Sequence, residues 1–150
     1  MSNSTKYGLF NSIVGLLIGI HLTFSSIGDG YWIYIIAAPL SIFFCGAFFW
    51  NYVTRKFKLS GEGRSSIIGV LTGSVSHYIC WVFISIGMNI CYLVFGNCKG
   101  SSGSPPAQIW EMMFYGIGMT GWSLILYGWI TMPCSIGIAI LVDRFNKNNA

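Results

Sequence analysis

The sequence predicts an all-α integral membrane protein that crosses the bilayer four times, with both termini in the cytoplasm. Hydrophobic residues make up 54% of the chain and charged residues only 8%, whereas an ordinary soluble domain carries roughly a quarter charged residues. So few charges do not cover the surface of a soluble globule of 150 residues. Four long apolar stretches separated by turn residues and charges suit a bilayer instead, since one crossing needs about 20 apolar residues.

The first two apolar stretches are each close to the length of one crossing. The first covers residues 7–27 and ends at Gly28-Asp29-Gly30, a strong turn signal. The second covers residues 31–53 and stops before the basic segment 55–58. A cleaved signal peptide is the alternative for the first stretch. Its exit lacks a small-x-small cleavage site, so a retained helix is favoured.

The third and fourth apolar stretches are too long for one simple crossing. We expect residues 65–88 to form the third span and residues 121–142 the fourth, with residues 89–120 outside the membrane core. That segment would be an external loop followed by an interfacial stretch, because Trp and Tyr favour the membrane–water interface. A long fourth helix that includes residues 107–120 is the alternative. The expected external contact residues are Trp110, Glu111 and Tyr115.

Basic residues beside the spans orient the chain. With four crossings, the two termini and the connector between the second and third spans share one side of the membrane. That side holds seven of the eight basic residues: Lys6, Arg55, Lys56, Lys58, Arg64, Arg144 and Lys147. The positive-inside rule makes this side cytoplasmic. We expect the chain in the plasma membrane, which is the inner membrane of a bacterial cell. The basic residues follow the span ends rather than one face, so nucleic acid is not an expected partner.

Two pairs of segments resemble each other. Residues 12–19 and 66–73 share five of eight positions, and residues 39–42 pair with residues 133–136. A duplication would divide the fold into two parallel helical-hairpin repeats, related by an axis along the membrane normal. A chance match is the alternative, because apolar sequence draws on few residue types.

Glycine pairs with small-x3-small spacing occur in the first and third spans. Such glycines let two helix backbones approach closely. Close packing of this kind drives the association of transmembrane helices, because the hydrophobic effect does not act between helices in lipid. We expect them to pack helices within the chain, with a homodimer seam as the alternative. The four residues are Gly15, Gly19, Gly69 and Gly73.

Polar side chains inside the first and third spans form a candidate polar path. Ionisable groups within a membrane are functional candidates by default, although neutral histidines hydrogen-bonded between helices are the favoured interpretation. A haem between the two histidines has no nearby carboxylate to support it, so no cofactor is expected. The path residues are His21, Thr23, Thr72, Ser74 and His77. Ser76 is a further polar residue of the third span, but it points to another side of the helix than Ser74 and His77.

Signals for an enzyme or a metal site are weak. Magnesium-assisted chemistry uses clustered carboxylates, and the four in this chain are scattered outside the span cores. Cys91 and Cys98 are expected on the external side, where their spacing allows a disulfide in an oxidising compartment. These two ligands alone are too few for zinc, so no metal is expected.

The leading hypothesis is a non-enzymatic inner-membrane protein that binds membrane proteins or lipids, such as an accessory subunit or an immunity-type protein. The alternative is a small transporter or channel with its polar path between the first and third helices. Expected partners are membrane lipids and another membrane or envelope protein, with a homo-oligomer also open. A solvated cavity at the membrane midplane would distinguish the two functions.

Overall fold

The computed structural model describes residues 2–25, 31–57, 61–96, 98 and 104–147, with side chains up to Phe145. These residues form an all-helical fold with four helical stretches that are long and apolar enough to cross a membrane. The chain therefore has the form of a multi-pass helical membrane protein. Its helices are α1 (Asn3–Ser25), α2 (Tyr34–Lys56), α3 (Glu62–Phe95), α4 (Ile109–Ser123) and α5 (Trp129–Lys147).

Helices α1 and α2 form an antiparallel pair. Helix α1 begins before the predicted span 7–27, because the Ser2 hydroxyl accepts a hydrogen bond from the Thr5 backbone N–H at 3.2 Å and so caps the first turn. The predicted exit of this span, residues 26–27, lies outside the described residues. A short 3-10 turn, η1 (Tyr31–Ile33), leads into α2, which extends past the predicted end at residue 53 to Lys56.

Helix α3 is longer than the predicted third span because nothing breaks it after residue 88. It ends at Gly96, which has a left-handed φ of 65° and donates its N–H to the Tyr92 carbonyl at 3.0 Å. Glycine takes this conformation at helix C-termini without steric cost. Residues 89–95, predicted as the start of the external segment, therefore continue α3.

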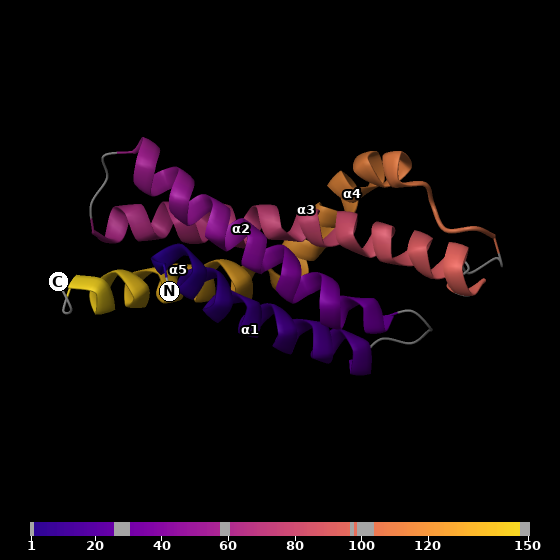
Figure 1. Cartoon of the computed structure of the whole chain (residues 1–150), viewed down its shortest axis with the longest axis horizontal. Helices are drawn as coiled ribbons and strands as arrows, with labels where there is room; N and C mark the ends of the chain where they lie inside the picture. Colours follow the sequence, from indigo (N-terminus) through magenta and orange to yellow (C-terminus); the bar gives the residue numbers. More distant parts are fainter. Residues whose placement is uncertain (1, 26–30, 58–60, 97, 99–103, 148–150) are drawn as a thin grey trace.

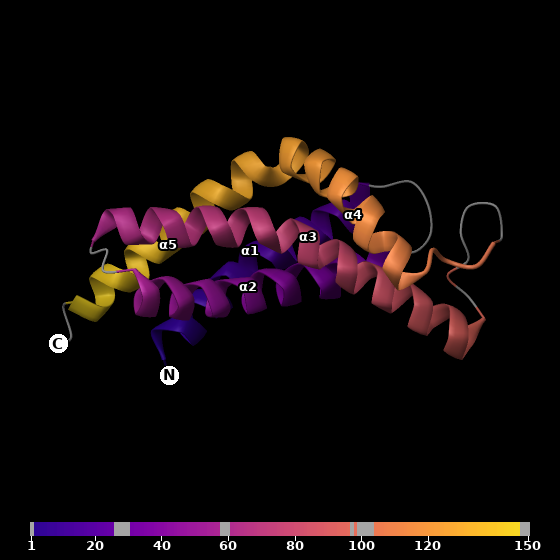
Figure 2. The ribbon, with the colours of Figure 1, turned by 90° about the horizontal axis from the view of Figure 1, so that it is seen from above.

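The predicted boundary at residue 121 is not a helix boundary in the structure. A capping box starts α4, with the Glu111 carboxylate accepting the Gln108 N–H at 3.1 Å, and such reciprocal bonds specify a helix N-terminus. The helix then runs through a π-helical turn, η2 (Leu124–Gly128), into α5. A π turn widens the helix and bends it, and Figure 2 shows α4 and α5 arching over α3. The structure therefore agrees with the alternative of a long fourth helix, which begins at Ile109.

Helices α1, α2, α3 and α5 form a four-helix bundle in which each packs against two others. Helix α1 contacts α2 and α5, while α3 contacts α2 and α5. Among the described helices, α1 and α3 lie diagonally opposite and their backbones do not approach closely, and α4 packs against α3 alone. Figure 1 shows the chain ends, the end of α2 and the start of α3 at one end of the long axis, here called the termini end. Helix α4 and the end of α3 lie toward the other end, the α4 end.

The bundle buries polar side chains inside and exposes large apolar side chains outside, as expected for helices surrounded by lipid. At the termini end, α1, α2, α3 and α5 share one closely packed cluster. It consists of Tyr7, Trp50, Val53, Ile68, Ala139 and Val142. We call it the apolar plug, because it closes the bundle on that side.

Candidate functional site

His77, near the middle of α3, is the one imidazole that the structure places inside the bundle. Its Nε2 lies 2.9 Å from the Thr131 hydroxyl of α5, and its Nδ1 bonds the Ser123 hydroxyl at the end of α4. A straight α-helix would separate residues 123 and 131 by about 12 Å along its axis. The bent segment around η2 therefore lets one ring reach both hydroxyls, and it fixes α3 to both sides of the bend.

A cavity of about 50 Å³ lies beside His77, where α1, α2, α3 and η2 meet. A water molecule needs roughly 10–15 Å³ of such space and two or more polar partners, so the cavity holds water or one very small group. Hydroxyls already engage both nitrogens of His77. The cavity is mostly apolar, with polar groups on several sides. They belong to Tyr34, Ser41, Ser76, Ser123, Tyr127 and Thr131.

The five predicted path residues do not come together. His21 is exposed and pairs with the Ser25 hydroxyl at 3.3 Å, while the hydroxyl of the half-buried Ser74 donates to the Val70 carbonyl of its own helix at 2.7 Å. Only His77 of the five lines the cavity, together with its neighbour Ser76. The physical reason is the diagonal placement of α1 and α3: their backbones do not approach closely, and the α1 residues that line the cavity are apolar or glycine.

The other two path residues differ in how their hydroxyls are satisfied. The Thr23 hydroxyl lies within hydrogen-bonding distance of the Gly19 carbonyl, at 2.8 Å, and of the Tyr31 carbonyl, at 3.0 Å. Backbone bonding of this kind is common for Thr within helices, so Thr23 needs no solute to satisfy it. Thr72 is completely buried and does not line the cavity, and its hydroxyl has no hydrogen-bond partner among the described residues.

A second polar cluster was missed by the sequence reasoning. The Ser135 hydroxyl of α5 donates to Asn11 Oδ1 of α1 at 2.6 Å, and Asn11 Nδ2 donates to the Tyr7 carbonyl at 2.9 Å. The Tyr7 hydroxyl donates to the Ser135 carbonyl at 3.3 Å. Asn11 lies one helical turn before Gly15, on the face that the glycine spacing already marked as buried, and that was the available signal.

All four seam glycines lie where two helices touch within the chain. A Cβ atom on Gly15 would lie 2.9 Å from the Ala38 carbonyl oxygen, and one on Gly19 would lie 2.5 Å from the Tyr34 carbonyl oxygen. These positions define the α1–α2 seam. On the α3–α5 seam, Cβ atoms on Gly69 and Gly73 would meet the Cα atoms of Ile136 and Met132 at 2.5 Å and 2.8 Å.

Helix α4 and the connector before it are attached to α3 at several points. A disulfide joins Cys91 of α3 to Cys98 of the connector, with their Cα atoms 5.9 Å apart. The Asn89 amide donates to the Ala107 carbonyl at 3.0 Å, and the Tyr78 hydroxyl donates to the Met113 carbonyl at 3.3 Å. The predicted contact residues Trp110 and Tyr115 are exposed on α4, whereas Glu111 serves in the capping box.

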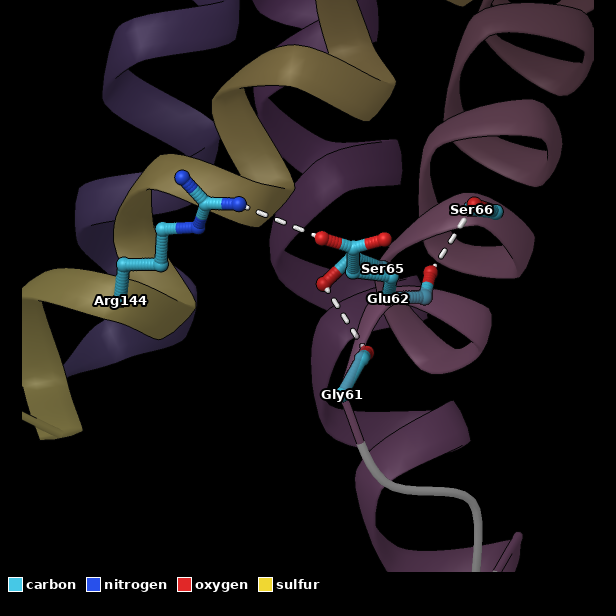
Figure 3. A network of polar contacts seen from close by, with 5 residues as sticks. All are labelled: Gly61, Glu62, Ser65, Ser66 and Arg144. Carbon is cyan, nitrogen blue, oxygen red and sulfur yellow. Dashed lines mark hydrogen bonds and ion pairs between the residues drawn. The ribbon is translucent and has the colours of Figure 1, made fainter.

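Two ion pairs join α3 to α5 at the termini end. Figure 3 shows the Arg144 guanidinium reaching the Glu62 carboxylate, at 3.2 Å. A second pair joins the partly exposed Arg64 to the nearly buried carboxylate of Asp143. In the same first turn of α3, the Ser66 hydroxyl donates to the Glu62 carbonyl at 2.9 Å. The exposed pair adds little stability, while separating the less exposed pair would leave a charge in a poorly solvated position.

No protein-family model, curated protein or solved structure matches this chain. Within the described residues, no group of three or more His, Cys, Asp or Glu side chains lies close enough together to hold a metal ion. Function must therefore be argued from the geometry of the bundle and the chemistry of its surface.

Proposed function

We propose that this chain is a non-enzymatic inner-membrane protein that binds another membrane or envelope protein through α4. The observation that carries the proposal is that α4 packs against α3 alone and leaves an aromatic face uncovered. We call this surface the α4 face. It comprises Trp110, Met113, Phe114, Tyr115, Ile117 and Trp122, each at least half exposed.

The composition and support of the α4 face suit protein recognition. Large aromatic side chains contribute most of the energy at protein interfaces and lose little conformational entropy when they bind. The Tyr78 hydrogen bond holds α4 on α3, and the Asn89 hydrogen bond holds the chain two residues before α4 begins. A surface fixed in this way meets a partner without a further ordering cost.

The interior of the bundle favours a binding protein over a channel. A polar solute crossing hydrocarbon loses several kcal/mol for each unsatisfied group, so a channel needs a hydrated route. The cavity beside His77 is small, and the apolar plug separates it from the termini end. The imidazole finds its hydrogen-bond partners within the protein.

A small transporter remains the second candidate because of η2. π-helical turns often mark functional sites, and this one stands beside an intramembrane histidine and a cavity. The transport route would then pass between all four bundle helices rather than between α1 and α3. Solute flux in reconstituted vesicles that disappears in a folded His77→Ala protein would favour this alternative.

Photo-crosslinking tests the proposed contact surface. A photoreactive amino acid at Phe114 should capture one discrete membrane protein in intact cells, and Trp122→Ala should reduce that capture. The matched control is Leu17 on α1, which is also well exposed but lies outside the α4 face. Equal capture from both positions, or capture of the same protein after Trp122→Ala, would contradict a specific surface.

The orientation and the duplication belong to the same proposal. The seven basic residues on the side of the termini favour a cytoplasmic location for that end of the bundle. Equivalent contacts support two hairpin repeats. A Cβ on Gly15 would meet Ile42 at 2.9 Å, and a Cβ on Gly69 would meet Ile136 at 2.5 Å. Gly15 aligns with Gly69, and Ile42 with Ile136, in the two matched sequence segments.

A further inference from the structure

Two neighbouring cations stand at the termini end of α2. Arg55 and Lys56 occupy its last turn, and both side chains are exposed. In the part of the chain that the structure describes, the ion pairs engage Arg64 and Arg144, and neither pair involves these two residues. The helix dipole favours cations at this position, which explains their charge but not the shape of the surface around them.

A groove that is open on its outer side adjoins these cations. It is lined by side chains of α2 alone: Phe48, Asn51, Tyr52, Arg55 and Lys56. The spacing of these residues places them along one side of α2. The Lys56 ammonium lies 5.3 Å from the centre of the Tyr52 ring, within the range of a cation–π contact. The polar groups gather toward the helix end, and Phe48 forms the part farther into the span.

An exposed aromatic column continues from the groove along α2. The rings of Phe48 and Tyr52 stack with their centroids 5.9 Å apart. Phe44 lies one turn further into the span, and 54% of its surface is exposed. Cations at the end of a span with an apolar column below them match the layout of a phospholipid, which has an anionic head and an acyl chain beneath it.

We propose that this groove binds an anionic phospholipid, with its phosphate against Arg55 and Lys56 and an acyl chain along Phe48 and Phe44. Arginine suits this role because its guanidinium forms paired hydrogen bonds with phosphate oxygens. Asn51 adds an amide donor to the same rim. The site lies at the end of the bundle opposite α4 (Figure 1), so it does not depend on the protein-binding role proposed for the α4 face.

Native mass spectrometry of the full chain in neutral detergent tests the proposal. Phosphatidylglycerol should remain bound under conditions that remove phosphatidylcholine. Arg55→Gln and Lys56→Gln should each weaken phosphatidylglycerol binding by roughly tenfold or more, because each removes a hydrogen bond to the charged phosphate. Both variants should keep the circular dichroism spectrum of the parent protein, because the side chains are exposed.

Matched controls separate a defined site from general attraction. Lys6→Gln removes the same charge from an exposed residue near the N-terminus of α1, a helix that starts toward the termini end (Figure 1), and it should leave lipid binding unchanged. Phe48→Ala should weaken binding, whereas Phe10→Ala, at a comparably exposed ring on α1, should not. A loss with Lys6→Gln equal to that with Arg55→Gln would overturn the proposal, as would equal effects of the two Phe variants. Displacement of the lipid by millimolar inorganic phosphate would also overturn it, because the site would then bind a free anion.

Discussion

Replacing Gly69 with alanine should force α3 and α5 apart. The new Cβ would lie 2.5 Å from the Cα, N and Cγ1 atoms of Ile136, whereas carbon atoms in favourable contact are about 3.5–4.0 Å apart. The helices must therefore separate by about 1 Å. Two of the three clashing atoms are backbone, so a change of rotamer does not relieve the contact.

The expected cost can be bounded from two opposing effects. Overpacking a close interface typically costs about 1–3 kcal/mol. Alanine is better than glycine in a helix by roughly 0.5–1 kcal/mol, which offsets part of that cost. We expect Gly69→Ala to lower the free energy of unfolding by about 1–2 kcal/mol, because the same movement also stretches the His77 bond to Thr131.

Equilibrium unfolding in mixed detergent micelles, followed by circular dichroism, measures this effect. The matched control is Gly137→Ala, which adds a methyl group to α5 one residue beyond Ile136, where no atom lies within 4 Å. The control should be neutral or stabilising by up to about 1 kcal/mol. If Gly69→Ala proves as stable as Gly137→Ala, the close-contact argument for the seams is wrong.

Two further predictions concern the histidine and the disulfide. His77→Ala should lower the free energy of unfolding by about 1–3 kcal/mol through lost hydrogen bonds and a new cavity, while Ser74→Ala, which removes only a bond within α3, should change it by less than about 0.5 kcal/mol. If the two variants lower the free energy of unfolding equally in the same assay, the His77 hydrogen bonds do not join the helices as described. Cys91 and Cys98 should resist alkylation until reduced, and a membrane-impermeant reagent should then label Cys98 only from the non-cytoplasmic side. Labelling from the cytoplasm would reverse the proposed orientation.

The helical class of the fold was predictable because each apolar stretch is long and ends at glycine or charge. The extent of the last stretch was harder to predict. Its composition of Trp, Tyr and Glu is typical of an interface, yet the local bonds between Gln108 and Glu111 begin a helix there. Capping hydrogen bonds set the start of α4, and hydropathy and composition do not reveal such bonds.

The candidate site was predictable only in part, because it depends on which helices become neighbours. His21 and His77 look alike in sequence, but α1 presents His21 outward while α3 presents His77 toward α5. Hydropathy does not specify the order of helices around a bundle. The glycine spacing marked which faces are buried, but it did not say that α1 would pack on α2 and α3 on α5. The π turn that aims Ser123 and Thr131 at one ring has no simple sequence signature.

The pairing of α3 with α5 bears on how the chain is made. A membrane protein enters the bilayer in order of synthesis, and α1 can pack on α2 as soon as the first hairpin has left the ribosome. Helix α3 stays incomplete for longer, because Thr131, the partner of His77, lies on α5 and is made later. Until α5 is made, the imidazole of α3 lacks this partner, and an unpaired polar group in lipid is costly. Helix α5 therefore sets the moment at which α3 becomes stable in the membrane, and a ribosome stalled before α5 leaves a chain that quality-control proteases should recognise.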